Sequence, residues 1–110
     1  MQVQSITKNV RMSAQKMRET VRQIQGLPAL HAQAVLAVVP RKSARIVAKT
    51  LKSAIANAEN NNGVKPETLR VKEAVAQTAT TLKRFTPKAR GSAGPILKRS
   101  CHVKIVVSDE

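Results

Sequence analysis

The 110-residue sequence has almost no aromatic side chains: Phe85 is its one aromatic residue, and it has no Trp or Tyr. Any core must therefore be built from aliphatic residues and Met. Stacking of splayed bases on aromatic rings, the binding mode of many single-strand binders, is barely available to such a chain. A single cysteine, Cys101, cannot form an internal disulfide, which agrees with a reducing compartment.

Long apolar runs are also missing. No run approaches the roughly 20 residues that span a bilayer, and residues 1–13 contain no apolar stretch of the signal-peptide kind. We therefore expect a soluble, intracellular protein of the cytoplasm.

Acidic residues are few, with 6 Asp and Glu against 20 Lys and Arg, which gives a formal net charge of +14 and a pI near 11.3. Self-repulsion of this size destabilises a free compact chain, so a polyanionic partner is expected. Nucleic acid and an anionic membrane are the two candidates.

Catalytic residue patterns are absent from the sequence. His31 lies in an apolar segment and is expected to be packed or half-buried. Cys101 and His102 are neighbours on a predicted strand and should point to opposite faces, which argues against a nucleophile pair. Two His and one Cys without ligand spacing predict no metal site. We expect no enzymatic activity, cofactor or small-molecule substrate.

Three helices are predicted. Ser13 can cap the first, in which Met17, Val21 and Ile24 form an apolar stripe that ends at Gly26. Residues 27–40, bounded by prolines and apolar on most sides, predict a short buried helix.

The third helix, from Lys42 to about Asn60, has two distinct faces. One face is apolar and comprises Val47, Leu51, Ala54, Ile55 and Ala58. Another has a basic row, Arg45, Lys49 and Lys52, which is either a solvated helix face or a set of phosphate contacts; the overall charge favours contact with phosphates.

Two strands are indicated after the helices. Residues 68–85 have intermittent alternation and many Thr, and Cys101, Val103, Ile105 and Val107 should form the buried face of the last strand. Residues 3–10 also contain β-branched side chains. The predicted fold class is α+β: a single domain over residues 1–110, with three helices packed on a small antiparallel sheet.

The stretch at residues 82–99, LKRFTPKARGSAGPILKR, predicts a basic β-hairpin arm that extends from the body. It has six Lys or Arg and no acid, and its Gly-, Pro- and Ala-rich middle suits a tip that enters a narrow space. A flexible basic loop is the alternative. A two-stranded ribbon is marginal in water, so the arm should order fully against its partner.

Two further function classes compete with RNA binding. A DNA-bending protein with β-arms would need an apolar wedge and a dimer interface, and the tip offers little beyond Pro87 and Pro95. A membrane-surface protein would need bulky apolar residues opposite its cations, whereas the third helix has mainly Ala and Val there.

Three segments, VRMSAQKMR (residues 10–18), LKSAIANAENN (51–61) and residues 82–110, closely resemble the bacterial family of large-subunit ribosomal protein 22. The resemblance implies a compact α/β body with a long β-hairpin. It also implies binding to the large-subunit rRNA, a role in early assembly, neighbouring ribosomal proteins as partners, and a hairpin that lines the polypeptide exit tunnel and contacts the nascent chain.

The resemblance and the charge pattern together give a set of expected site residues. Those expected to bind rRNA are Lys8, Arg11, Lys16, Arg18, Arg45, Lys49, Lys52, Lys83, Arg84, Lys98 and Arg99. Those expected to form the tunnel-facing tip are Lys88, Ala89, Arg90, Gly91, Ser92 and Ala93. In the family, Arg or His is common where Lys88 stands here, and residues at Ser92 and Gly94 are often charged.

Overall fold

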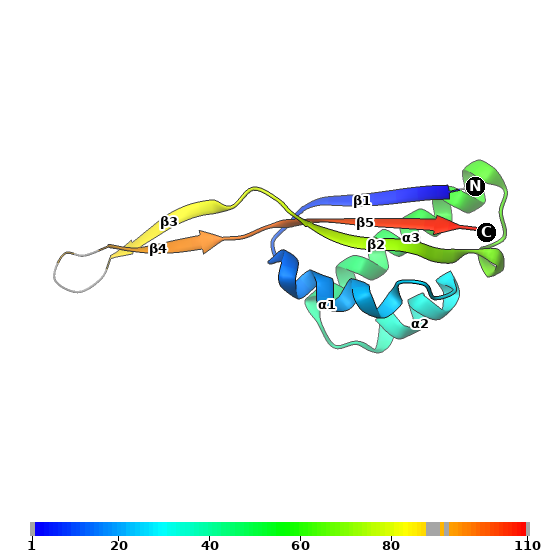
Figure 1. Cartoon of the computed structure of the whole chain (residues 1–110), viewed down its shortest axis with the longest axis horizontal. Coiled ribbons are helices and arrows are strands. Elements are labelled where there is room, and N and C mark those ends of the chain that lie inside the picture. Colours follow the sequence, from blue (N-terminus) through cyan, green and yellow to red (C-terminus); the bar gives the residue numbers. More distant parts are fainter. Residues whose placement is uncertain (1, 88–90, 92, 110) are drawn as a thin grey trace.

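The computed structural model describes residues 2–87, 91 and 93–109, with the backbone alone described at 84–87 and 93–96. In chain order the elements are β1 (Gln2–Val10), α1 (Ala14–Ile24), α2 (Ala29–Val38), α3 (Lys42–Asn62), the 3₁₀ turn η1 (Pro66–Thr68), β2 (Arg70–Thr78), β3 (Leu82–Pro87), β4 (Ala93–Lys98) and β5 (Cys101–Ser108). Helices and an antiparallel sheet are thus combined as the α+β prediction requires (Figure 1).

Helix α1 begins and buries its apolar stripe as predicted. The Oγ of Ser13 accepts a hydrogen bond from the Lys16 backbone N–H at 3.4 Å, which satisfies one of the free donors at the helix start. Met17 and Ile24 are completely buried, and Val21 is nearly so. The sequence pattern therefore identified both the cap and the core face of this helix.

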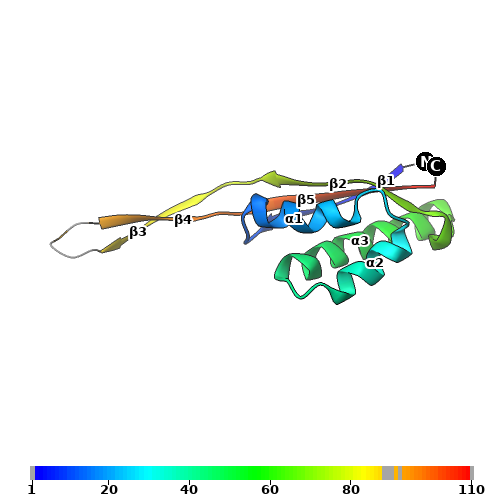
Figure 2. The same ribbon diagram turned by 60° about the horizontal axis from the view of Figure 1, so that its bottom comes forward.

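Helix α2 forms where it was predicted, but the prediction that it is buried was wrong. Only Ala29, Ala32 and Leu36 are buried, on one side of the helix. Leu30 and Val38 are 45% and 80% exposed, and His31, which was expected to be packed or half-buried, is exposed as well. The physical reason is that α2 packs mainly against α3 at the outer edge of the helical layer, so its far side has no neighbour among the described residues (Figure 2).

Helix α3 buries the predicted apolar face and ends in a left-handed cap. Gly63 has φ +65°, and its N–H donates to the Glu59 carbonyl at 3.1 Å. The Val64 N–H donates to the Ala58 carbonyl at 3.4 Å. The Gly63 bond is the 5→1 bond of an αL motif, in which a residue without Cβ relieves the strain of positive φ.

The body sheet has the order β1-β5-β2, and β5 is antiparallel to both neighbours. All three helices lie on one face of this sheet, and the other face is open (Figure 2). Val103, Ile105 and Val107 of β5 are fully buried beneath the helices, as the alternation predicted. Val106 was expected to point outward and is nevertheless only 5% exposed, because it lies on the central strand between its cross-strand neighbours Gln4 and Glu73.

Strands β3 and β4 form a second, two-stranded antiparallel sheet, with pairs from Leu82↔Lys98 to Pro87↔Ala93. This sheet projects from the body as an arm (Figure 1). The molecule measures 63 × 25 × 17 Å and has a radius of gyration of 17.1 Å, whereas a compact chain of this length would have one of about 13 Å.

The arm is not a simple continuation of β2 and β5. Between the two sheets the Ala79 N–H donates to the Ser100 carbonyl at 3.1 Å, and the Ser100 Oγ donates to the Thr80 carbonyl at 2.6 Å. Buried Ser100 therefore ties together the base of the arm, and each sheet has its own ladder of hydrogen bonds.

Candidate nucleic-acid interface

An open groove of about 570 Å³ lies between β1 and the first turns of α3. Apolar Ile6 and Ile46 contribute to its wall, and its described lining residues include no Asp or Glu. Four exposed cations line it: Lys8, Arg11, Lys42 and Lys49. All the charged side chains that line this concave surface are positive, and such an arrangement concentrates anions.

Local contacts hold the two walls of the groove together. The Thr7 and Thr50 hydroxyls form a 2.7 Å hydrogen bond between β1 and α3. The Lys42 Nζ donates to the Arg11 carbonyl at 3.2 Å, which brings the start of α3 against the end of β1. The register of β1 shifts between Thr7 and Val10, where Asn9 adopts φ +57°. This β-bulge, which re-aims the strand, lies next to Lys8 and Arg11.

A smaller hollow of about 180 Å³ lies beside this groove at the base of the arm. Asn9 and Arg11 line both spaces, and Leu82 and Lys98 of the arm line the second. The cations that line these two adjacent spaces are named here the basic track: Lys8, Arg11, Lys42, Lys49 and Lys98. The track runs from α3 along the end of β1 to the arm.

The other predicted cations lie in three places outside the track. Arg45 and Lys52 are exposed on α3, in the same helical row as Lys49. Lys16 and Arg18 are on α1, and the Arg18 Nε donates to the Ala76 carbonyl of β2 at 3.2 Å. This contact places Arg18 at the β2 side of the body, away from the β1 side on which the groove lies.

The remaining predicted residues belong to the arm. Lys83 on β3 and Arg99 beside β4 are exposed, whereas only the backbone of Arg84 is described. At the tip, Gly91 has φ +74° and Ala93 begins β4. The tip assignments of Lys88, Ala89, Arg90 and Ser92 lie outside the described residues.

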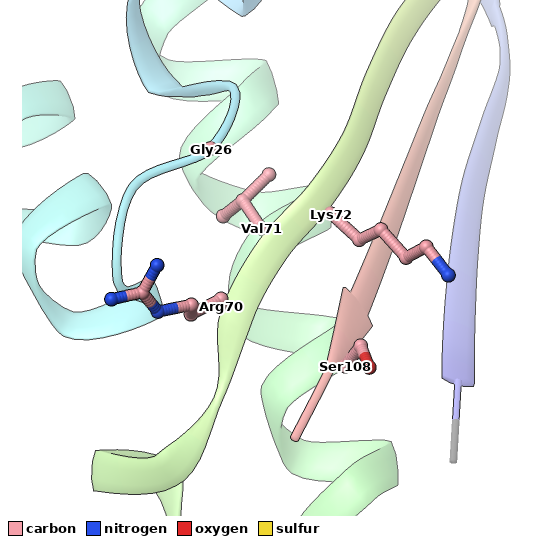
Figure 3. A pocket seen from close by; sticks show the side chains of 5 residues that line it. All are labelled: Gly26, Arg70, Val71, Lys72 and Ser108. Carbon is pink, nitrogen blue, oxygen red and sulfur yellow. The ribbon is translucent and has the colours of Figure 1, made fainter. Parts of the chain in front are cut away.

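The sequence reasoning missed Lys42, which lies seven residues before Lys49 and three before Arg45. Extending the predicted basic row by one helical turn would have included it. Arg70 and Lys72, which the sequence reasoning did not name either, lie outside the basic track: they line a hollow of about 320 Å³ with Gly26, Val71 and Ser108 at the end of the sheet opposite the arm (Figure 3). Strand alternation alone does not separate such cations from ordinary solvated ones.

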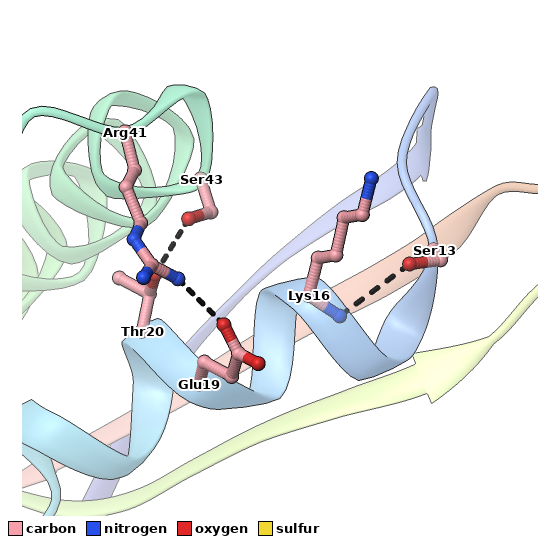
Figure 4. Close-up of polar contacts among 6 residues, drawn as sticks. All are labelled: Ser13, Lys16, Glu19, Thr20, Arg41 and Ser43. Carbon is pink, nitrogen blue, oxygen red and sulfur yellow. Dashed lines mark hydrogen bonds and ion pairs between the residues drawn. The ribbon is translucent and has the colours of Figure 1, made fainter.

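Polar contacts also join α1 to the start of α3. Thr20 and Ser43 form a buried hydroxyl–hydroxyl bond between α1 and α3, and Arg41 pairs with Glu19 on the surface (Figure 4). Glu19 thus offsets a cation outside the basic track.

Cys101 and His102 lie as the strand alternation predicted. Cys101 is fully buried, and burial raises the pKa of its thiol above the ordinary value, so the thiol stays protonated. His102 is half-buried, and its Nδ1 accepts a hydrogen bond from the Asn9 N–H at 3.1 Å. The two side chains therefore have separate structural surroundings.

No helix in the described part of the chain is long and apolar enough to cross a membrane.

Comparison with known proteins gives a match over almost the whole chain. The family model of ribosomal protein L22p/L17e matches residues 5–108. The large ribosomal subunit protein uL22 of Opitutus terrae is 52% identical over 109 residues, which cover 99% of this chain and 96% of that protein. The protein of the same name from Akkermansia muciniphila is 43% identical over 110 residues, or 100% and 98% of the two chains. The chain with this basic groove and arm therefore belongs to the ribosomal protein L22p/L17e family, whose members are structural constituents of the ribosome and not enzymes.

Proposed function

We propose that this chain is a constituent of the large ribosomal subunit in the cytoplasm, where it binds the large-subunit rRNA through the basic track. The observation that supports this most strongly is the adjacency of two concave surfaces that share Asn9 and Arg11: together they present five cations, from α3, from the end of β1 and the residue after it, and from β4. A folded RNA offers closely spaced phosphates in irregular arrangements, which a curved basic surface can follow.

The arm then extends this contact away from the body. Besides Lys98 of the track, the arm has two further exposed cations among the described residues, Lys83 and Arg99. A narrow two-stranded ribbon can enter a passage in folded RNA that a globular body cannot. We place the arm along the wall of the polypeptide exit tunnel, with the tip against the nascent chain and a neighbouring ribosomal protein. Early binding during assembly would suit a protein that connects distant rRNA segments.

The test is competition between protein-free large-subunit rRNA and duplex DNA of equal phosphate content, measured with the purified full chain across a salt series. Counterion release lowers both affinities as salt rises, so the preference that remains at physiological salt is the informative quantity. A persistent preference for rRNA supports recognition of its folded shape. Equal competition would mean that the charge acts without such recognition, and a DNA-architectural function would then explain the chain better.

A further inference from the structure

The exposed side of α2 is an apolar surface on an otherwise basic molecule. Leu30 and Val38 are 45% and 80% exposed, and Ala34 and Ala37 between them are also exposed. These four residues recur at i, i+4, i+7 and i+8, so they share one side of the helix. We name them the α2 stripe. Exposed apolar surfaces that gather in this way mark interaction sites more often than isolated apolar residues do.

This part of the chain also lacks charge. Residues 23–40 contain no Lys, Arg, Asp or Glu, whereas each of the five strands and both other α-helices contain at least one Lys or Arg. RNA binding depends on cations that replace the counterions of phosphates. The α2 stripe is therefore the face of the body least suited to RNA.

Cations nevertheless lie at both ends of the stripe. At the amino end, Arg70 pairs with Pro28 in an isolated β-bridge and directs its side chain toward the connection between α1 and α2 (Figure 3). At the carboxyl end, Arg41 lies three residues after the last residue of α2, and its side chain is still 54% exposed although it pairs with Glu19. A complementary surface would be apolar in its centre and acidic at its ends.

We propose that the α2 stripe docks an amphipathic helix of a second protein, with apolar residues on the docked side and acidic residues flanking them. The small side chains of Ala34 and Ala37 let a second helix approach closely between the larger Leu30 and Val38. A second copy of this chain is a poor occupant, because two molecules of charge +14 repel each other.

The length of the stripe sets how strong this contact can be. The nine residues from Leu30 to Val38 span about 12 Å of helix, which is a little more than two turns. Such a small patch gives weak affinity between free proteins. When rRNA already holds both partners, however, their effective concentration is high and a weak contact is occupied. This inference therefore rests on the proposed place of the chain in the ribosome.

Thiol labelling in defined particles tests the proposal. Because Cys101 is completely buried, a cysteine introduced on the surface is the reactive thiol of the chain. Ala34→Cys reports on the α2 stripe. Ala56→Cys is the matched control, because Ala56 is another exposed helical alanine and lies one turn beyond Lys52 in the basic row of α3. Maleimide labelling rates are measured for the free chain, for the chain on protein-free rRNA, and for the assembled large subunit.

We expect the Ala34→Cys thiol to react equally fast in the first two states and at least tenfold more slowly in the assembled subunit. The Ala56→Cys thiol should already be protected on rRNA alone. Protection of Ala34→Cys by rRNA alone would show that RNA covers the stripe, and undiminished labelling in the subunit would show that nothing covers it. Protection that depends on the concentration of the free chain would identify a second copy. Each of these three results overturns the proposal.

The control separates this proposal from the proposed function. If Ala56→Cys stays reactive on rRNA, the assignment of the α3 row to RNA fails, whatever happens at α2. The chemistry of the partner is tested by attaching a benzophenone maleimide to Ala34→Cys and identifying the peptide that is cross-linked in the assembled subunit. An amphipathic segment with Asp or Glu beside its apolar residues supports the proposal, whereas a basic or extended segment contradicts it.

Discussion

Removing two cations from the groove should weaken rRNA binding far more than removing two cations elsewhere. Lys42→Gln combined with Lys49→Gln takes away two of the four cations that line the space between β1 and α3. Both side chains are exposed, so the core should be retained, while Lys42→Gln also removes the hydrogen bond from the Lys42 Nζ to the Arg11 carbonyl. The matched control is Lys65→Gln combined with Lys72→Gln, which lowers the net charge equally but lies outside the groove.

The size of the effect follows from counterion release. Each phosphate contact contributes about 0.7 to 0.9 to the slope of log affinity against log salt, so two lost contacts reduce the slope by about 1.4 to 1.8. If the variant and the unmodified chain bind equally at 1 M salt, this change in slope makes the variant bind about 15- to 30-fold more weakly at 0.15 M salt. The control pair should change affinity by less than about threefold if its lysines do not contact phosphate.

Filter binding or fluorescence titration of protein-free large-subunit rRNA at several salt concentrations measures both slope and affinity. Circular dichroism spectra and melting curves of the two variants verify that they remain folded. Equal losses for the groove pair and the control pair would refute the reasoning, because they would show that net charge, not the position of the cations, determines binding.

Further predictions concern the fold and the buried thiol. Deleting residues 83–96 should leave a folded body with weakened rRNA binding, because the arm has its own hydrogen-bond ladder; loss of the helical circular dichroism signal would contradict this. Met17→Ala, at a completely buried position, should lower the free energy of unfolding by about 2 to 5 kcal/mol, measured by urea denaturation, and a loss below about 1 kcal/mol would mean that α1 does not pack as described. Gly63→Ala, at φ +65°, should cost about 1 kcal/mol in the same assay, and no change would be inconsistent with the left-handed cap. Burial raises the pKa of the Cys101 thiol, so the stability gained from its protonated form is complete at neutral pH and is lost as pH rises from the ordinary thiol value of about 8.5 through the raised value. A Cys101→Ala variant should lack this alkaline loss of unfolding free energy. Equal decreases in unfolding free energy with pH for the variant and the unmodified chain would contradict the assignment.

The helices and the central strand could be predicted from sequence because their patterns are local. The position of Ser13 predicts the start of α1, and the spacing of Met17, Val21 and Ile24 predicts its buried side. The alternation in β5 likewise identified its buried face. In contrast, α2 is apolar on both sides, so its sequence does not say which side faces the protein. The exposure of Leu30 and Val38 depends on the packing of α2 against α3.

The groove could not be predicted from local patterns, because it needs two segments that are distant in sequence. Lys8 comes from β1 and Arg11 directly follows that strand, while Lys42 and Lys49 come from α3, more than thirty residues later in the chain. The sequence named three of these four cations as RNA-binding residues from charge and resemblance. These four cations line the same groove because the Thr7–Thr50 hydrogen bond and the packing of α3 on the sheet bring β1 and α3 together.

The central claim is that one connected set of cations contacts rRNA, and lysine acetylation of the chain–rRNA complex tests it most directly. Mass spectrometry would compare the acetylation rate of each lysine in the free and bound chain. We predict strong protection of Lys8, Lys42, Lys49 and Lys98, with little change at Lys65, which lies outside the groove and the arm. Uniform protection of all lysines, or protection of Lys65 without protection of Lys42 and Lys49, would contradict the claim.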